Sequence, residues 1–244
     1  MLNLALGFYA ILAIFEGKFL YAAWAIVASH FCDIIDGRVA RMTNSTSSFG
    51  IEFDSFADWI SFGIAPAIMM YHLILYKYEK LGFAIALFYV IAGSLRLAKF
   101  NIRSFEQKDE VPSYFTGLPI PAAGGMLAAF VLVYQMFYQE ITHKTIPLLM
   151  KNIPTIARLM PVLIFFLGVA MVSNVKWNNF KKVKFSRPKP LRTLVTALIF
   201  VLLLYAYTEN VIFLLYLTYF LWGITELLMR VKNWGKRGQT DGQK

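Results

Sequence analysis

Runs of about 20 apolar residues, separated by short polar segments, dominate this sequence. Of its 244 residues, 58% are hydrophobic and only 16% are charged, whereas a globular domain of this size carries about a quarter charged residues. A helix of about 20 apolar residues spans the hydrocarbon core of a bilayer. We therefore predict an all-α fold, a polytopic transmembrane helical bundle without a separate soluble domain.

Turn residues divide the chain into about eight predicted helices. Gly63 and Pro66 predict a kink in the third helix, and Gly124 and Gly125 in the fifth either permit close helix contact or mark a kink. A charged loop is predicted at 104–116 and a disordered polar tail at 231–244. The predicted helices are 2–15, 19–41, 50–76, 81–101, one beginning near 117, 153–172, 191–207 and 211–230.

Four aspartates lie within the second and third predicted helices. Asp33 and Asp36 share one arc of the second helix at ~100° per residue, and Asp54 and Asp58, four residues apart, share one face of the third. The small polar residues between them predict a tight reversal. Two helix ends joined in this way can direct all four carboxylates to one place.

Their apolar surroundings argue against the alternative that these acids are solvated charges at helix ends. A carboxylate inside a membrane span costs several kcal/mol unless it is paired or bound to metal. Four anions also repel one another, so the group calls for a divalent cation. Hard oxygen ligands favour Mg²⁺, Mn²⁺ or Ca²⁺ over zinc.

The complete pattern from Asp33 to Asp58 is D-x2-D-G-x2-A-R-x8-G-x3-D-x3-D, which resembles the signature of the CDP-alcohol phosphatidyltransferase family. The segments 117–125 (GLPIPAAGG) and 173–177 (SNVKW), with Lys181 and Lys182 after the second, look like the phosphatidylserine synthase branch. The resemblance implies a family membrane domain at 1–184. Hydrophobicity alone predicts two additional transmembrane helices at 185–230, and the polar tail follows at 231–244.

This resemblance implies a phosphotransferase that moves the phosphatidyl group from CDP-diacylglycerol to L-serine and releases CMP. Glycerol phosphate, inositol phosphate or another alcohol remains an alternative acceptor. An ion or solute transporter with intramembrane carboxylates is the rival from another class. We disfavour the transporter because transporters often contain internal repeats and midplane sites, whereas this sequence has no evident repeat and its acids lie near one face.

The family's site residues carry over to matching positions. The resemblance implies that the metal ligands are Asp33, Asp36 and Asp54. It also implies that Asp58 lies at the metal and acts as the catalytic base. One or two Mg²⁺ or Mn²⁺ ions would bind there, and Ca²⁺ is a further possible occupant. The implied CDP-diacylglycerol-binding residues are Asp33, Gly37, Ala40, Arg41, Ser47 and Gly50. The alternatives are helix packing for Gly37 and Ala40, snorkelling for Arg41 and a turn role for Ser47.

A serine acceptor carries a carboxylate, so its pocket needs a cation. Arg96 is the first candidate, followed by Lys99 and Arg103, and Ser173 and Asn174 are candidates to close the pocket. The alternative for the three basic residues is anchoring at the cytoplasmic membrane surface.

The positive charges indicate an orientation in the membrane. Counting alternate loops places 18 of the 24 Lys and Arg residues on the side of the aspartate motif and of both termini, which predicts that this side is cytoplasmic. Asp33 lies ~21 Å along its helix from Phe19, roughly 9 Å below that surface. We expect a multi-pass protein of a prokaryotic cell membrane whose basic surface meets anionic lipids and binds no nucleic acid. Its oligomeric state, including a homodimer, stays open.

Overall fold

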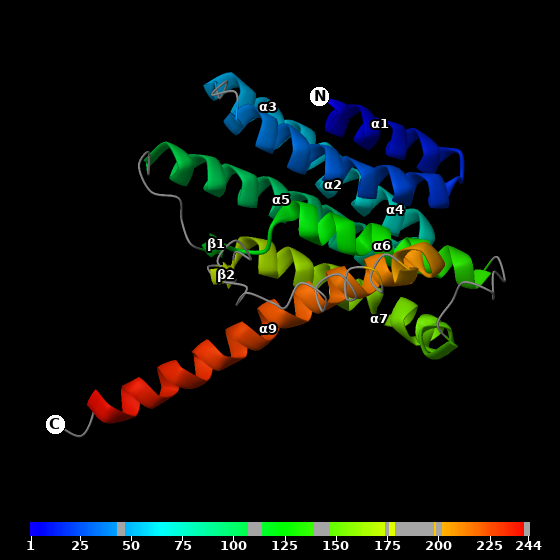
Figure 1. The fold of residues 1–244 in the computed structure, drawn as a ribbon. Helices are drawn as coiled ribbons and strands as arrows, with labels where there is room; N and C mark the ends of the chain where they lie inside the picture. The colour runs from blue at the N-terminus through cyan, green and yellow to red at the C-terminus, as the bar shows by residue number, and fades with distance from the viewer. Residues whose placement is uncertain are drawn as a thin grey trace.

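The computed structural model describes residues 1–42, 47–106, 114–138, 147–173, 176–178, 198 and 202–241. Within these ranges, the side chains at 40, 41, 48, 103–106, 114–116, 147–150, 176–178 and 226–241 are outside the description. Its main helices are α1 (Leu2–Phe15), α2 (Phe19–Met42), α3 (Ser48–Asp58), α4 (Ala65–Leu73), α5 (Glu79–Glu106), α6 (Ile120–Tyr138), α7 (Pro147–Val172) and α9 (Thr208–Asp241). Figure 1 shows them packed side by side as a bundle, from which the C-terminal part of α9 projects.

The first two predicted helices are confirmed to within one residue by α1 and α2. The third is confirmed in position but consists of α3, a π-helical turn (Trp59–Ile64), α4 and a short 3₁₀ turn (Leu75–Tyr78). The π-helical turn contains Gly63, and Pro66 lies in the first turn of α4, so the predicted irregularity is present. α3 begins earlier than predicted because the Ser47 hydroxyl accepts a hydrogen bond from the Gly50 N–H at 3.0 Å and caps the helix.

Four described helices are long and apolar enough to cross a membrane, namely Phe19–Val39, Leu75–Ile102, Ile120–Tyr138 and Lys151–Val172. Helix α6 is the most enclosed of them: most of its side chains are buried against α2, α7, α9 and the π-helical turn. By contrast, α1, α2, α5 and α7 expose large hydrophobic side chains, as expected of helices that face lipid. The predicted polytopic helical membrane fold is confirmed.

Two predictions at the ends of helices were wrong. The chain is helical through Asp241, where a disordered tail was predicted, because Leu, Met, Arg and Lys at 227–232 are strong helix formers that continue α9. The predicted loop 104–116 is shortened at both ends: α5 runs to Glu106, and Tyr114–Thr116 forms a strand. The predicted helix 191–207 lies mostly outside the described residues.

That strand, β1, pairs antiparallel with β2 (Lys176–Asn178), so the segments that follow α5 and α7 meet. Gly117 follows β1 with a φ of +81°, a conformation that favours glycine. A β-carbon at Gly117 would also clash with the carbonyl oxygen of Met171. The Leu118 N–H donates to the Ala170 carbonyl at 3.0 Å, which fixes the start of α6 against the end of α7.

Gly124 permits the close contact between α6 and the π-helical turn, one of the two alternatives for this glycine pair. A β-carbon there would lie 2.7 Å from the Phe62 carbonyl oxygen and 2.8 Å from its Cα. That carbonyl already accepts a hydrogen bond from the Tyr89 hydroxyl at 3.0 Å. The backbone of the turn therefore has little room to move.

Gly124→Ala should consequently lower the melting temperature of the detergent-solubilised protein by about 3–10 °C, as expected for overpacking a close contact. The matched control is Gly37→Ala, because no described atom lies within 4 Å of the added β-carbon there. The control should melt at or slightly above the wild-type temperature. Equal melting temperatures for both variants would contradict this role of Gly124.

Candidate active site

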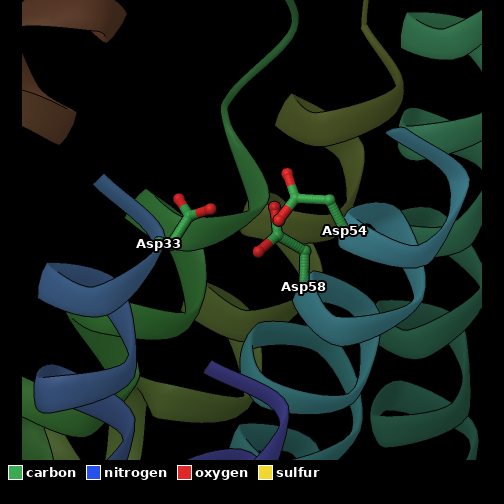
Figure 2. A group of neighbouring side chains, drawn as sticks. All are labelled: Asp33, Asp54 and Asp58. Atoms are coloured by element: carbon green, nitrogen blue, oxygen red, sulfur yellow. The ribbon is translucent and has the colours of Figure 1, made fainter. Parts of the chain in front are cut away.

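Three of the four predicted aspartates meet at one place. Asp33 comes from α2, and Asp54 and Asp58 come from successive turns of α3. One oxygen from each carboxylate lies within 4.8 Å of the other two, and Figure 2 shows Asp33 facing the pair across the space between the helices. Asp58, the deepest, is only 9% exposed. The i, i+4 spacing predicted the pair on α3, and the reversal between α2 and α3 brings Asp33 opposite.

Asp36 lies outside this group. Its carboxylate accepts a hydrogen bond from the amino group of Met1 at 3.1 Å, and its side chain is 43% exposed. The prediction that four carboxylates converge on one point is therefore correct for three. Asp36 is nearly one helical turn beyond Asp33, nearer the end of α2.

The carboxylate group Asp33–Asp54–Asp58 suits a divalent cation. Oxygens bound to one Mg²⁺ or Ca²⁺ at 2.0–2.6 Å are separated by at most about 4–5 Å, which matches the 4.8 Å limit of this group. Among the described side chains, none of the three forms an ion pair within 4 Å. Their mutual repulsion is thus left for a cation to offset.

Asn3 is a polar neighbour of this group that the sequence reasoning missed. This buried residue of α1 donates a hydrogen bond from its side-chain amide to Asp58 Oδ1 at 2.8 Å. A lone amide within the apolar run 2–15 was the available signal, because a buried polar group needs a partner. Sequence spacing alone could not name that partner, 55 residues away.

Three of the residues predicted to bind CDP-diacylglycerol, Gly37, Ser47 and Gly50, lie near the end of α2 and at the start of α3. The open space around Gly37 argues against its alternative role in helix packing. Ser47 acts as the N-cap of α3, so its turn role is observed, and Gly50 is exposed in the first turn of that helix. The side chains of Ala40 and Arg41 lie outside the description.

Arg96, the first serine-pocket candidate, is buried on α5 with 7% exposure. It interacts electrostatically with Asp58 and Tyr219, and its guanidinium carbon lies 5.6 Å from the centre of the Phe100 ring. Among the described residues, its Nε has no hydrogen-bond partner. A buried guanidinium with an unused donor suits an anionic ligand better than it suits surface anchoring.

The other candidates for this pocket cluster at the end of α7. The Lys99 ammonium donates to the Val172 carbonyl at 3.5 Å, and the Ser173 hydroxyl donates to the Ala170 carbonyl at 2.7 Å. Both therefore bind the C-terminal turn of α7. The Arg103 side chain and Asn174 fall outside the described part of the chain.

The comparisons with known proteins agree with this geometry. Residues 1–151 match the family model described as CDP-alcohol phosphatidyltransferase. The chain is 38% identical over 226 residues to the CDP-diacylglycerol–serine O-phosphatidyltransferase of Helicobacter pylori strain 26695, covering 93% of this chain and 87% of the relative. It is 35% identical over 180 residues to the Bacillus subtilis protein of the same name, covering 74% and 87%.

A more distant relative, the archaetidylserine synthase of Methanothermobacter thermautotrophicus, is 35% identical over 144 residues, or 58% of each chain. The family-model match covers more than half of the chain and includes every aspartate of the motif. The resemblance drawn from the motif is thereby confirmed, and the chain belongs to the CDP-alcohol phosphatidyltransferase family.

Proposed function

We propose that this protein transfers the phosphatidyl group of CDP-diacylglycerol to L-serine, producing phosphatidylserine and CMP. The observation that carries the proposal is the buried Arg96 guanidinium, which interacts electrostatically with Asp58 of the carboxylate group and whose Nε has no hydrogen-bond partner among the described residues. A site that binds a diphosphate then also contains a cation that can bind the carboxylate of an amino acid. Relatives that bear the name of this activity cover most of the chain.

The residues fit a divalent metal, Mg²⁺ or Mn²⁺, held by Asp33, Asp54 and Asp58, with Asp36 nearby as the further ligand implied by the motif. When bound, such an ion neutralises phosphate oxygens and stabilises the leaving phosphate. The proposed site lies close to the cytoplasmic surface, so a lipid's phosphates reach it while its acyl chains remain in the bilayer. Labelling cysteines introduced at either terminus with an impermeant reagent tests this orientation.

The chain's own groups carry the proposed transfer. The serine hydroxyl oxygen forms a bond to the phosphorus that bears the diacylglycerol, the bond from that phosphorus to the CMP oxygen breaks, and Asp58 accepts the hydroxyl proton. Arg96 holds the serine carboxylate through charge-assisted hydrogen bonds. The open space at Gly37 accommodates the cytidine, and Arg41 holds the diphosphate.

Arg96→Gln should raise the KM for serine about 10- to 150-fold, the loss expected from one hydrogen bond to a charged group of ~1.5–3 kcal/mol. The KM for CDP-diacylglycerol should change by less than about threefold. Steady-state kinetics with each substrate varied in turn measures both. The matched control is Arg158→Gln, a change of an exposed arginine on α7, which should leave both constants unchanged. Unaltered serine kinetics in Arg96→Gln would reduce Arg96 to a structural cation.

The proposed acceptor is tested by offering the purified protein CDP-diacylglycerol with serine, glycerol 3-phosphate, inositol phosphate or no alcohol, and measuring CMP release. We expect release to require serine. Release driven by another alcohol would keep the enzyme class but replace the acceptor. If no alcohol supports release, the proposed function is wrong.

A further inference from the structure

Asn3 is the point at which four segments of the bundle meet through polar groups. Its side chain, on α1, is 2% exposed and donates to Asp58 Oδ1 on α3 at 2.8 Å. The Ser29 hydroxyl on α2 donates toward both the side-chain and the backbone carbonyl oxygens of Asn3. The Ser61 hydroxyl, in the π-helical turn, donates to the same backbone carbonyl at 3.0 Å.

These contacts determine which way the Asn3 amide points. Its NH₂ group faces Asp58 because an ionised carboxylate only accepts hydrogen bonds, and its oxygen then lies against the Ser29 hydroxyl, which can donate to it. A carboxylate that accepts a hydrogen bond from a buried, oriented amide is restricted in rotation. Asn3 therefore fixes one oxygen of Asp58, and the other is left for the chemistry of the site.

Close packing keeps α1 in this position. A β-carbon at Gly7, one turn after Asn3, would clash with the Ser61 hydroxyl and lie 2.9 Å from the Ser61 Cα. The backbone of α1 thus lies directly against the π-helical turn that begins at the residue after Asp58. Single turns of π-helix often occur at functional sites, and this one brings Ser61 to the Asn3 carbonyl.

We infer that Asn3 is a positioning residue for the reaction: by binding Asp58 Oδ1 it aims Oδ2 at the serine hydroxyl that Asp58 deprotonates. This inference rests on the proposed function. The competing explanation is that Asn3 merely satisfies buried polar groups and holds α1 in the bundle. The two explanations differ in whether the turnover rate or only the stability depends on the Asn3 side chain.

The variant Asn3→Leu separates them, because leucine has a similar shape and no amide. The hydrogen bonds from Ser29 and Ser61 to the backbone carbonyl survive this change, so the bundle should still assemble. We expect kcat to fall about 10- to 150-fold, the range for a lost hydrogen bond to a charged group. The KM values for serine and CDP-diacylglycerol, and the binding of CDP-diacylglycerol in a titration without serine, should stay within about threefold.

The matched control is Ile14→Ala, on the same helix, where a buried side chain distant from Asp58 is truncated. It should lower the melting temperature at least as much as Asn3→Leu while leaving kcat unchanged. If Asn3→Leu does not fold, Ser29→Ala provides a second route, since it removes the donor that orients the amide. Ser29→Ala should lower kcat severalfold with the same KM values.

A kcat for Asn3→Leu within twofold of wild type would overturn the inference, as would a rise in the KM for CDP-diacylglycerol as large as the fall in kcat. In the fallback variant, a kcat equal to wild type would do the same. Wild-type protein that releases no CMP with serine would instead refute the proposed function, and the inference with it. Serine-dependent wild-type release with unimpaired variants would refute the positioning role alone.

Discussion

Asp58→Asn is expected to lower kcat about 10²- to 10⁴-fold, the loss typical when a general base is removed. Asparagine has the same shape as aspartate but cannot accept the proton of the serine hydroxyl. Asp58 is buried, interacts electrostatically with Arg96 and accepts a hydrogen bond from Asn3, which suits the proposed role of base for an acceptor bound to Arg96. Single-turnover kinetics on preloaded enzyme measures this loss directly.

The same variant should bind CDP-diacylglycerol within a few-fold of wild type, because Asp33 and Asp54 remain. Asp54→Asn is the matched comparison: Asp54 is one turn away on the same face and exposed, and we assign it chiefly to the metal. That variant should weaken metal and liponucleotide binding together. If Asp58→Asn loses liponucleotide binding as severely as Asp54→Asn, then Asp58 serves only as a metal ligand and not as the base.

Removal of divalent metal is expected to reduce CMP release to the uncatalysed background. Without a cation, three carboxylates within 4.8 Å of one another repel a diphosphate instead of binding it. Added Mn²⁺ or Mg²⁺ should restore the rate, and Zn²⁺ should not, because an all-oxygen ligand set favours hard cations. The measurement is CMP release in excess chelator, followed by titration with each metal.

A thermal-shift titration provides a readout that does not depend on turnover. Mn²⁺ should raise the melting temperature of wild-type protein with the logarithm of its concentration once that exceeds the Kd, and should have little effect on Asp33→Asn. Full activity in excess chelator would contradict the metal assignment. An equal Mn²⁺ shift in Asp33→Asn would place the ion elsewhere in the bundle.

The parts of the structure that could be predicted from the sequence depend on local spacing. The bounds of α1 and α2 follow from apolar runs that end at the polar turn Glu16–Lys18 and in the segment after Met42. The pairing of Asp54 and Asp58 on one face follows from their separation by four residues. Arg96 could be selected because a serine acceptor carries a carboxylate that needs a cation in its pocket, and its role there stays a prediction.

The features that were not predicted depend on contacts between distant segments. The strand pair β1–β2 has only three residues in each strand, too few for a pattern of alternating side chains. The contact of Asp36 with Met1 joins residues 35 positions apart in the sequence. The role of Asn3 depends on partners 26, 55 and 58 residues away, and helical periodicity contains no information on such partners.

The most direct test of the account supplies ¹⁵N-labelled serine and CDP-diacylglycerol to the purified protein, and compares CMP formed with labelled phosphatidylserine formed by mass spectrometry. With Mn²⁺ present, we predict equal molar amounts of the two products, and we predict neither product in excess chelator or with Asp58→Asn. CMP without labelled lipid would show hydrolysis instead of transfer. Labelled lipid formed at the full rate in chelator, or by Asp58→Asn, would contradict the catalytic role assigned to the carboxylate group.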